Sequence, residues 1–475
     1  MRRDSRREDD EDPLAQQLQE HNFLQTFMGV IGNVLEWYDF AVFGYLSDVL
    51  GEVFFPPQAN HSATVESLAV FGGAFLMRPV GGLLLGYLGD TYGRDKALVW
   101  SIFLMAGPTF LMGCLPSYDQ VGSIAIVLLI VVRCLQGLSV GGQLVSSLVY
   151  TLERQDPSKW GLYGSFVMAA ANFGTLLGGL IGMALRTKLS HEQLVAWGWR
   201  LPFLSGIIVS FSGCYLRSHG ESHHVVESAA EGVSRTGPNG TSEEPPPRVN
   251  PLREAFKKGN RRSLAAAAMV PMLWAAGFYM SFVWMAIYMA DLLDDPVPHA
   301  FAVNSGALLL SVCILFPIAG ILSDRFGRKR IMVIGGVGMA VLSPILIIVI
   351  GKGDPLLAFC AQSLMGISLS FWGSPMCAWL VEAFSPEARL TSVAIGYNVA
   401  QAFAGGLTPA LATLMVDDVG VNSPGLILTI LAATSLTGLL VVAPESSTVR
   451  VTATNFAAVP THSELELPAR DGELT

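Results

Sequence analysis

Long apolar stretches alternate with short polar segments along most of the chain. We read twelve such stretches, each close to the ~20 apolar residues that a helix needs to cross the hydrocarbon core of a bilayer. They begin near Leu24, Glu66, Ala97, Gly122, Lys159, Arg200, Ser263, Ala300, Arg330, Pro355, Ala388 and Gly425. The pattern predicts an all-α membrane protein with twelve transmembrane helices.

The longest polar interruption separates the first six apolar stretches from the last six. It covers residues 218–262 and includes Thr236-Gly-Pro-Asn-Gly and Pro245-Pro-Pro. With so few apolar residues it is expected to be a disordered linker. The expected organisation is a cytosolic N-terminal tail (1–22), a first six-helix bundle (23–217), this linker on the cytoplasmic side, a second six-helix bundle (263–443) and a cytosolic C-terminal tail (444–475).

One short motif occurs twice, at the same place in each half. The copies are Gly86-Tyr-Leu-Gly-Asp-Thr-Tyr-Gly-Arg94 and Gly320-Ile-Leu-Ser-Asp-Arg-Phe-Gly-Arg328, and each closes one apolar stretch before the next begins. A small residue lets a neighbouring helix approach, and a glycine allows the positive φ of a tight turn. Duplication of this kind indicates two structural repeats, as in many membrane transporters.

Composition and charge agree with this interpretation. Only 14% of the 475 residues are charged and the mean hydropathy is +0.48, so the bilayer is expected to be the main solvent. The net charge of −9 comes largely from tails and loops, which gives no reason to expect nucleic acid as a partner. The expected partners are a small-molecule solute and the lipid bilayer, with the chain acting as a monomer.

No enzymatic site is recognisable in the sequence. The six cysteines have no metal-ligand spacing and no arrangement that predicts disulfides. We find no nucleophile beside a base and no glycine loop for a phosphate. The sequence therefore predicts neither an enzyme nor a metal or organic cofactor.

Basic residues gather in alternate loops, which sets the expected orientation. Loops near Arg94, Arg154 and Arg389 and between the two halves are basic, with Arg186 and Lys352 among the exceptions on the other side. By the positive-inside rule those basic loops and both termini lie in the cytoplasm. The expected location is the plasma membrane, crossed many times.

Two acidic residues, Glu36 and Asp39, lie in the first apolar stretch. Helical spacing puts them on one face with Gly32 and Phe43. A carboxylate at membrane depth costs roughly 2.5–3.5 kcal/mol, so it is retained where it is paired, hydrated or used. Because carboxyl groups bind and release protons, both residues are candidates for proton coupling. The alternative is that one of them lies near the interface and makes a structural hydrogen bond.

Arg133 lies inside the fourth apolar stretch, too far from either end for its side chain to reach water comfortably. It shares a helical stripe with Gln136 and Gln143, which we expect to face a cavity. If Arg133 pairs with an ionised acid of the first helix, protonation breaks the pair and couples proton binding to substrate binding. The alternative is a purely structural ion pair. Gly137 and Gly141 are expected to pack closely against a neighbouring helix.

A second cation, Arg78, lies within the second apolar stretch. It could bind a carboxylate group of a substrate or, equally, neutralise an acid of the first helix. Polar and aromatic side chains elsewhere are further candidates, although aromatic residues in membrane helices more often belong to the core or the lipid-facing belt. The expected substrate-binding residues are Arg78, Gln136, Gln143, Trp284, Tyr288, Trp372, Tyr397 and Asn398.

The duplicated loops suggest a gate at the cytoplasmic surface. Contacts of their charged residues with acids at the ends of the fourth and tenth helices would latch that side. Exposed ion pairs contribute only about 0–1 kcal/mol each, but a network present in one state shifts populations. The alternative is that these charged residues only set the orientation of the helices in the membrane. The expected gating residues are Asp90, Arg94, Glu153, Asp324, Arg328 and Glu382.

Six longer motifs accompany these residues. They are GNVLEWYDF at 32–40, FFP at 54–56, RPVGG at 78–82, QGLSVGG at 136–142, WGWRLPF at 197–203 and GLTP at 406–409. With the duplicated loops, they resemble the metabolite:proton symporter family of the major facilitator superfamily, which includes bacterial proline/betaine, α-ketoglutarate, citrate and shikimate transporters.

The resemblance implies the major facilitator fold and proton-driven uptake of a small organic acid or zwitterion by alternating access. It places intramembrane charge at Glu36, Asp39 and Arg133, with the proton as coupling ion and no other cofactor. Gln143 departs from the family, which commonly has Glu there, and the acidic tail lacks the coiled coil of osmosensing members. The alternatives are a passive facilitator, which would need no titrating carboxylate, and a non-transporting nutrient sensor, which usually carries a signalling extension.

Overall fold

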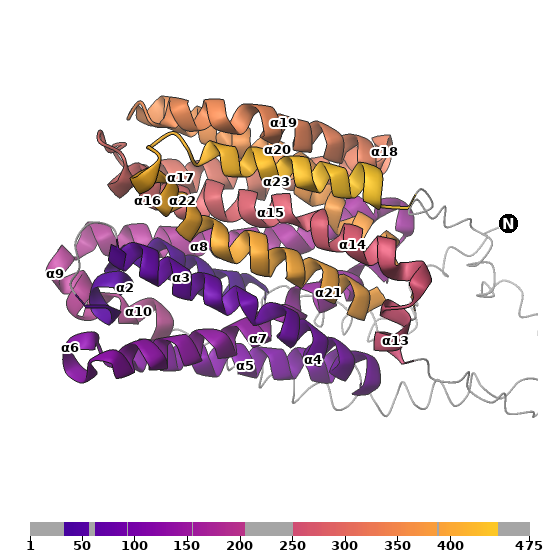
Figure 1. The fold of residues 1–475 in the computed structure, drawn as a ribbon, viewed down its shortest axis with the longest axis horizontal. Helices are drawn as coiled ribbons and strands as arrows, with labels where there is room; N and C mark the ends of the chain where they lie inside the picture. Colours follow the sequence, from indigo (N-terminus) through magenta and orange to yellow (C-terminus); the bar gives the residue numbers. More distant parts are fainter. Residues whose placement is uncertain are drawn as a thin grey trace, which may run out of the picture.

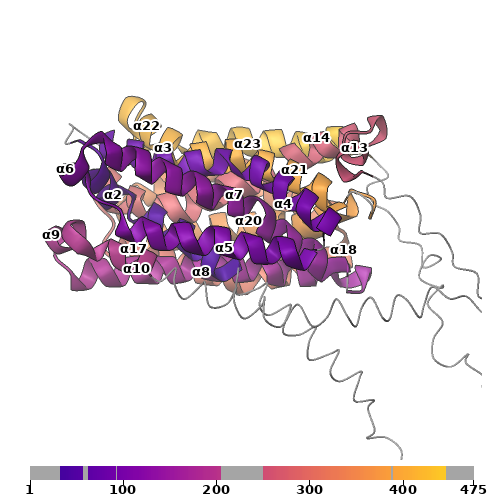
Figure 2. The ribbon, with the colours of Figure 1, turned by 90° about the horizontal axis from the view of Figure 1, so that it is seen from below.

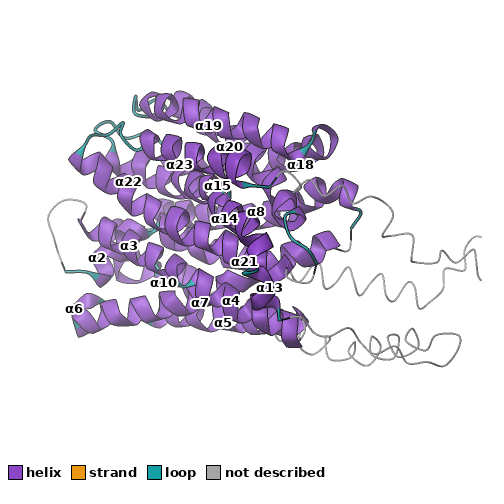
Figure 3. Ribbon diagram, turned by 45° about the vertical axis from the view of Figure 1, so that its right-hand side comes forward, coloured by secondary structure: helices purple, strands orange, loops and turns teal. Residues whose placement is uncertain are grey.

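The computed structural model describes residues 33–56, 62–92, 94–153, 155–204, 250–386 and 389–444. In these ranges the chain forms helices joined by short turns, with no strand (Figure 3). The first predicted helix is described from residue 33 to residue 45 and the sixth from Arg200 to Leu204. Their other parts lie outside the described residues. The predicted all-α architecture is confirmed.

Within the described ranges, nine helices are long and apolar enough to cross a membrane, and Trp100–Cys114 is a shorter apolar helix. Their starts agree with the predicted starts to within a few residues. The nine spans are Glu66–Leu88, Ser123–Glu153, Pro157–Lys188, Lys258–Leu292, Ala300–Phe326, Arg328–Ile350, Pro355–Glu382, Arg389–Asp418 and Gly425–Val442.

Several spans consist of α-helices joined end to end through π-helical turns. The first half contains helical residues 33–45, α2 (Ser47–Phe54), α3 (Ser62–Leu76), α4 (Arg78–Tyr92), α5 (Arg94–Cys114), α6 (Tyr118–Val121), α7 (Ser123–Glu153), α8 (Trp160–Lys188), α9 (His191–Gln193) and α10 (Arg200–Leu204). The second half contains α13 (Pro251–Ala255), α14 (Arg261–Met269), α15 (Pro271–Phe278), α16 (Met285–Ile287), α17 (Ala300–Leu308), α18 (Leu315–Phe326), α19 (Arg328–Ile350), α20 (Pro355–Glu382), α21 (Arg389–Ala400), α22 (Gly406–Asp418) and α23 (Gly425–Thr437).

The two halves form adjacent helical bundles, coloured indigo to magenta and red to yellow in Figure 1. The long helices of both bundles run along one common direction (Figure 2). Between the bundles, α8 packs on α17, α18 and α20, while α3 and α4 pack on α22 and α21. We call the end with α13 and the last turn of α18 the predicted cytoplasmic end, and the end with α2, α9 and α16 the predicted outer end.

The helices differ in how much of their surface the protein covers. The span Lys258–Leu292 has 83% of its most apolar window buried, whereas Arg328–Ile350 has 33% buried. Exposed apolar side chains of α19, such as Val341 and Ile345, face away from the bundle core. The span Lys258–Leu292 is therefore central, and the span Arg328–Ile350 is placed to contact lipid.

The close packing predicted for Gly137 and Gly141 is confirmed. A Cβ atom on Gly137 would overlap the backbone oxygen of Ala74 in α3, and one on Gly141 would overlap that of Arg78 in α4. Backbone contact of this kind is available only to glycine. These contacts hold α7 against both helices of the second span.

The linker predicted for residues 218–262 ends earlier than expected. Residues 250–262 contain α13 and the first turn of α14, whereas the rest of the interruption lies outside the described residues. Asn250 Oδ1 accepts hydrogen bonds from the backbone nitrogens of Leu252 and Arg253, and Pro251 occupies the first helical position. This cap and proline start a helix locally despite the polar composition.

Candidate functional site

A buried ion pair joins the first helix to α7. Arg133 Nη1 donates to Asp39 Oδ2 at 3.0 Å, and both side chains are 1% exposed. Two charges removed from water stabilise each other only with good geometry and further hydrogen bonds. The structure therefore brings together one of the predicted acids and the predicted cation of the fourth helix.

Gln136 supplies those further hydrogen bonds. Its Nε2 donates to Asp39 Oδ2 at 3.0 Å and to Thr109 Oγ1 at 2.9 Å, and its Oε1 accepts from Arg133 Nη1 at 2.6 Å. The Arg133 guanidinium also lies over the Phe43 ring, 3.7 Å from the ring centre. The amide of Gln136 is thus used to orient the ion pair, and its contact with substrate stays a prediction.

Glu36 and Arg78 form a second buried charged group, each about 1% exposed. The charges that act on Glu36 are those of Arg78 and Asp39. Within the described chain, neither Glu36 oxygen nor Arg78 Nη2 has a hydrogen-bond partner. Arg78 Nε donates to Asn398 Oδ1 over a long 3.4 Å. Because buried polar atoms without partners are rare, this group has bonding capacity left for a ligand.

Aromatic side chains from both halves meet beside Arg78, whose guanidinium lies over the Phe75 ring, 5.0 Å from the ring centre. Trp37 stacks on Tyr279 with ring centres 5.9 Å apart, and it meets Phe278 edge to face at 5.4 Å. Phe75 packs edge to face on Tyr279 at 5.0 Å. Since aromatic faces attract cations, this wall suits a ligand that carries positive charge on an apolar group.

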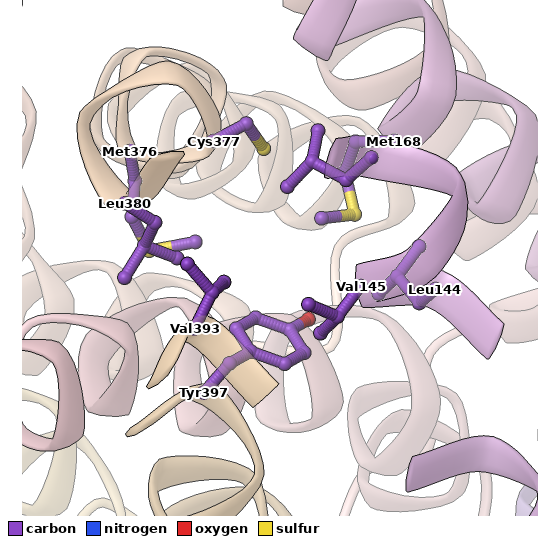
Figure 4. Close-up of a pocket in the computed structure, with 9 residues that line it drawn as sticks. Leu144, Val145, Met168, Met376, Cys377, Leu380, Val393 and Tyr397 are labelled. Atoms are coloured by element: carbon purple, nitrogen blue, oxygen red, sulfur yellow. The ribbon is translucent and has the colours of Figure 1, made fainter. Parts of the chain in front are cut away.

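A small apolar cavity lies between the halves, on the predicted cytoplasmic side of the charged groups. It is formed by α7 and α8 of the first half and by α20 and α21 of the second (Figure 4). The lining residues are Leu144, Val145, Leu148, Met168, Met376, Cys377, Leu380, Val393 and Tyr397.

Tyr397 and Gln143 keep their place as candidate substrate contacts. The Tyr397 hydroxyl accepts a hydrogen bond from Gln401 Nε2 at 2.7 Å, and its ring lines the apolar cavity. Gln143 is 2% exposed, and its Oε1 has no partner among the described residues. Both side chains project from helices that border the interface between the halves.

Three of the four predicted tryptophan and tyrosine contacts of the second half have polar atoms bonded within that half. Trp284 Nε1 donates to Thr413 Oγ1 at 2.9 Å, and Trp372 Nε1 donates to the Val270 oxygen at 3.2 Å. Tyr288 stacks on Trp284 and donates to a loop oxygen at 3.0 Å. Their polar atoms are bonded within their own half, and their contact with substrate stays a prediction.

Asp324 closes the predicted cytoplasmic end between the halves. Its carboxylate oxygens accept hydrogen bonds from the backbone nitrogens of Gly161 and Leu162, both at 2.9 Å, at the start of α8. A carboxylate at a helix N-terminus is favoured by the unpaired N–H groups and the helix dipole. Arg328 holds this carboxylate from the side and also donates to Glu382 Oε1 at 3.1 Å.

A second contact closes the same end. Arg389 Nη1, at the start of α21, donates to Glu153 Oε1 at 3.1 Å, at the end of α7. Glu153 was expected in the gate, but its partner Arg389 was not predicted from the sequence. Asp90 and Arg94, the other two predicted gating residues, have side chains outside the described part of the structure.

The predicted outer end is closed by a network around Tyr45. The Tyr45 hydroxyl donates to the Phe282 oxygen at 2.6 Å. Asn304 donates to the same oxygen at 2.9 Å and to Tyr45 at 3.1 Å, and Gln362 donates to Asn304 Oδ1 at 2.5 Å. Phe282 lies in the π-helical turn Tyr279–Trp284. Side chains thus hold both ends of the described structure closed around the charged groups.

Close glycine contacts between the halves accompany each closure and give a test of it. A Cβ on Gly72 would lie 2.5 Å from the Gly406 oxygen at the outer end, and one on Gly161 would lie 2.6 Å from the Gly320 oxygen at the cytoplasmic end. Overpacking of this kind costs about 1–3 kcal/mol. Gly161→Ala should therefore favour opening of the cytoplasmic end, and Gly72→Ala opening of the outer end.

The native thiol of Cys377 provides the readout, because it is buried in the apolar cavity. In a background where the other cysteines are alanine, a membrane-impermeant maleimide should label Cys377 from the cytoplasmic side about tenfold faster in Gly161→Ala and more slowly in Gly72→Ala. The matched control is Gly73→Ala, where a Cβ would meet nothing within 4 Å. Equal labelling in all three variants would contradict the gate assignment.

Several residues of interest were not predicted from the sequence, among them Tyr279, Arg389 and Asn172. Tyr279 carries no pattern that separates it from other aromatic residues of membrane helices. Arg389 was used only for orientation. Asn172 is fully buried in α8, and neither of its amide atoms has a partner in the described chain. A lone amide within an apolar helix is the signal that could have identified it.

Comparisons with known proteins place this geometry in a family. The model of the family "Sugar (and other) transporter" matches residues 25–455. The chain is 31% identical over 387 residues to the proline/betaine transporter of Escherichia coli K12, which covers 82% of this chain and 76% of that protein. It is 30% identical over 425 residues to the inner membrane metabolite transport protein YhjE of the same organism, with 86% and 92% covered.

Solved structures agree on the fold. The proton:xylose symporter XylE, a major facilitator superfamily protein solved with 6-bromo-6-deoxy-D-glucose, superposes with a TM-score of 0.69 at 18% identity, over 89% of this chain and 96% of that chain. A partially occluded inward-open form of XylE from E. coli gives 0.67. The likeness accounts for two pseudo-symmetric six-helix bundles, the predicted architecture. The chain therefore belongs to the sugar (and other) transporter family, has the major facilitator fold and is a multi-pass membrane transporter of a small-molecule solute.

Proposed function

We propose that this protein is a proton-coupled symporter of a small organic acid or zwitterion that works by alternating access. The observation that carries the proposal is the buried pair of Asp39 and Arg133, together with a second charged group in which three polar atoms, both Glu36 oxygens and Arg78 Nη2, have no partner among the described residues. A passive facilitator would have no need to keep a carboxylate at this depth. The names of the proline/betaine relatives and of the proton:xylose symporter support the same class.

Asp39 is the proposed proton carrier. Its Oδ2 accepts hydrogen bonds from Arg133 and Gln136, whereas its Oδ1 has no partner in the described chain. A proton that binds Oδ1 removes the negative charge without displacing either donor. Arg133 then loses its counter-ion, and the first helix and α7 are held less tightly. We propose the proton as the coupling ion and propose no other cofactor.

The second charged group is the proposed substrate site. Arg78 Nη2, which has no partner among the described residues, is available for a substrate carboxylate, and the two Glu36 oxygens, likewise without partners there, are available for a cationic group. The wall of Trp37, Phe278 and Tyr279 would contact the apolar body of a zwitterion. In this assignment Glu36 binds the substrate. Proton coupling was predicted for both Glu36 and Asp39, and here it is assigned chiefly to Asp39.

Transport requires the two closed ends to open in turn. With the basic loops in the cytoplasm, breaking of the Asp324 and Glu153 contacts opens the inner end and releases solute. Breaking of the Tyr45 network opens the outer end and admits solute. We propose the plasma membrane as the location, with both termini cytoplasmic and a monomer as the working unit.

The first test is uptake by the purified protein in proteoliposomes. The panel is proline, betaine, α-ketoglutarate, citrate, shikimate and lactate, each with and without an inward proton gradient. We expect gradient-dependent accumulation of at least one solute. Equilibration that ignores the gradient would identify a facilitator, and a complete lack of flux would favour a non-transporting sensor or a substrate outside the panel.

A further inference from the structure

Asn398 connects the two halves directly at the arginine of the proposed substrate site. It lies in α21 of the second half and is fully buried. Its Nδ2 donates to the Gly141 oxygen of α7 at 2.5 Å and to the Ala394 oxygen of its own helix at 2.8 Å. Its Oδ1 accepts from Arg78 Nε at 3.4 Å. One amide therefore binds both the backbone and the arginine of the first half.

The amide sits in a notch made by two glycines. A Cβ on Gly82 would lie 2.5 Å from Asn398 Nδ2 and 2.9 Å from the Gly141 oxygen. A Cβ on Gly141 would lie 2.5 Å from the Gly82 nitrogen. A side chain at Gly82 would push into the space that the amide occupies, and one at Gly141 would push α4 away from α7. The close approach of α4 and α7 thus creates a receptor for this one side chain of the other half.

The bond to Arg78 is the weak point of this arrangement. Nε and Nη2 form one edge of a guanidinium, the edge that binds a carboxylate through two parallel hydrogen bonds. Here Nη2 has no partner in the described chain and Nε has only the 3.4 Å bond to Asn398. Charge-assisted bonds of about 2.7–2.9 Å are roughly twice as strong as neutral ones. A carboxylate that takes this edge displaces the amide oxygen.

We propose that Asn398 is a positioning residue that transmits occupancy of Arg78 to the contact between the halves. An anionic group on Arg78 removes one of the two bonds that hold the amide in its notch. The bond from Nδ2 to the Gly141 oxygen is then the one that still holds the amide to the first half, so α21 moves away from α4 and α7 more easily. Val393 and Tyr397 of the same helix line the apolar cavity (Figure 4), so this movement opens the cavity toward the predicted cytoplasmic end. The inference rests on the proposed transport function.

The geometry also revises the role given to Asn398 by the sequence. A substrate contact would leave its amide free to bind solute, whereas here both ends of the amide are used for contacts between helices. The residue acts through Arg78 and does not need to touch the solute.

The experiment measures maleimide labelling of Cys377 in inside-out vesicles, in the background with the other cysteines changed to alanine. The probes are proline and α-ketoglutarate, each of which carries a carboxylate. In the parent protein, the transported probe should speed labelling. In Asn398→Leu, labelling without probe should already be about threefold to tenfold faster than in the parent protein, because one or two hydrogen bonds provide a shift of that size. Addition of the probe should then increase the labelling rate little further.

A second variant guards against loss of folding. Gly82→Ala leaves the amide in place but pushes against its Nδ2, so it should reproduce the faster, probe-independent labelling. Gly73→Ala, with open space around its Cβ, should behave as the parent protein. Labelling of Asn398→Leu and Gly82→Ala at the parent rate, with the full response to the probe, would overturn the proposal.

Failure of the proposed function gives a different result. In that case the parent protein takes up no solute from the panel. Failure of the present inference leaves uptake by the parent protein intact and the baseline labelling of both variants unchanged. The baseline comparison needs no solute, so the role of Asn398 in holding the halves together is decided in either case.

Discussion

Asp39→Asn should abolish proton-driven accumulation while leaving solute exchange across the membrane. The amide keeps the size of the side chain and an oxygen for Arg133, but it cannot bind and release a proton. In one-to-one symport, a gradient of one pH unit is equivalent to 1.36 kcal/mol and sustains about tenfold accumulation. The variant should reach a ratio of about one, measured as the internal to external concentration of radiolabelled solute in proteoliposomes.

The matched control is Asp354→Asn. Asp354 caps the start of α20 at the predicted outer end, where its Oδ1 accepts from the Leu357 nitrogen at 2.8 Å. Because asparagine caps a helix as well as aspartate, this variant should accumulate solute normally. If Asp39→Asn still accumulates solute tenfold under the same gradient, the proton is carried elsewhere, and Glu36 becomes the next residue to test.

Arg133→Met should destabilise the protein strongly. The change leaves the Asp39 carboxylate buried without its cation, and loss of one partner from a buried pair costs about 3–5 kcal/mol. Methionine fills much of the same volume and keeps contact with Phe43, so the effect comes from the charge. Thermal unfolding of the detergent-solubilised protein measures it as a large drop in midpoint temperature.

The double variant Asp39→Asn with Arg133→Met separates charge from packing. Replacement of both charges by neutral groups of similar size is often close to neutral in stability, so most of the lost midpoint temperature should return. The double variant should still fail to accumulate solute against a gradient. A double variant as unstable as Arg133→Met alone would mean that the ion pair does not account for the loss.

Much of the fold was predictable because the bilayer imposes a simple rule on sequence. A helix that crosses it needs about 20 apolar residues, so the spans are visible in the pattern, and their starts agree with the structure to within a few residues. Glycine pairs such as Gly137 and Gly141 were also predictable, since close helix packing requires small residues. The duplicated motif revealed the two halves.

The charged residues were identifiable for the same reason. A carboxylate or guanidinium at membrane depth is expensive, so Asp39 and Arg133 stand out in any apolar stretch. Their spacing in the sequence could not decide whether the acids of the first helix pair with Arg133 of the fourth helix or with Arg78 of the second. That choice depends on how the helices pack around one another.

The partners and the purpose of most polar side chains were decided by the tertiary structure alone. Gln136 orients the ion pair, Asn398 joins the halves, and Trp284 holds its own half together. In the sequence all three were equivalent candidates for substrate contact. The chain by itself determined which residues lie in the membrane and which of them carry charge, because those properties follow from solvation of each helix. Which of these groups meet depends on how each helix is rotated and on which distant segments of the chain pack together. Rotation and packing are set by tertiary contacts that no local sequence pattern encodes.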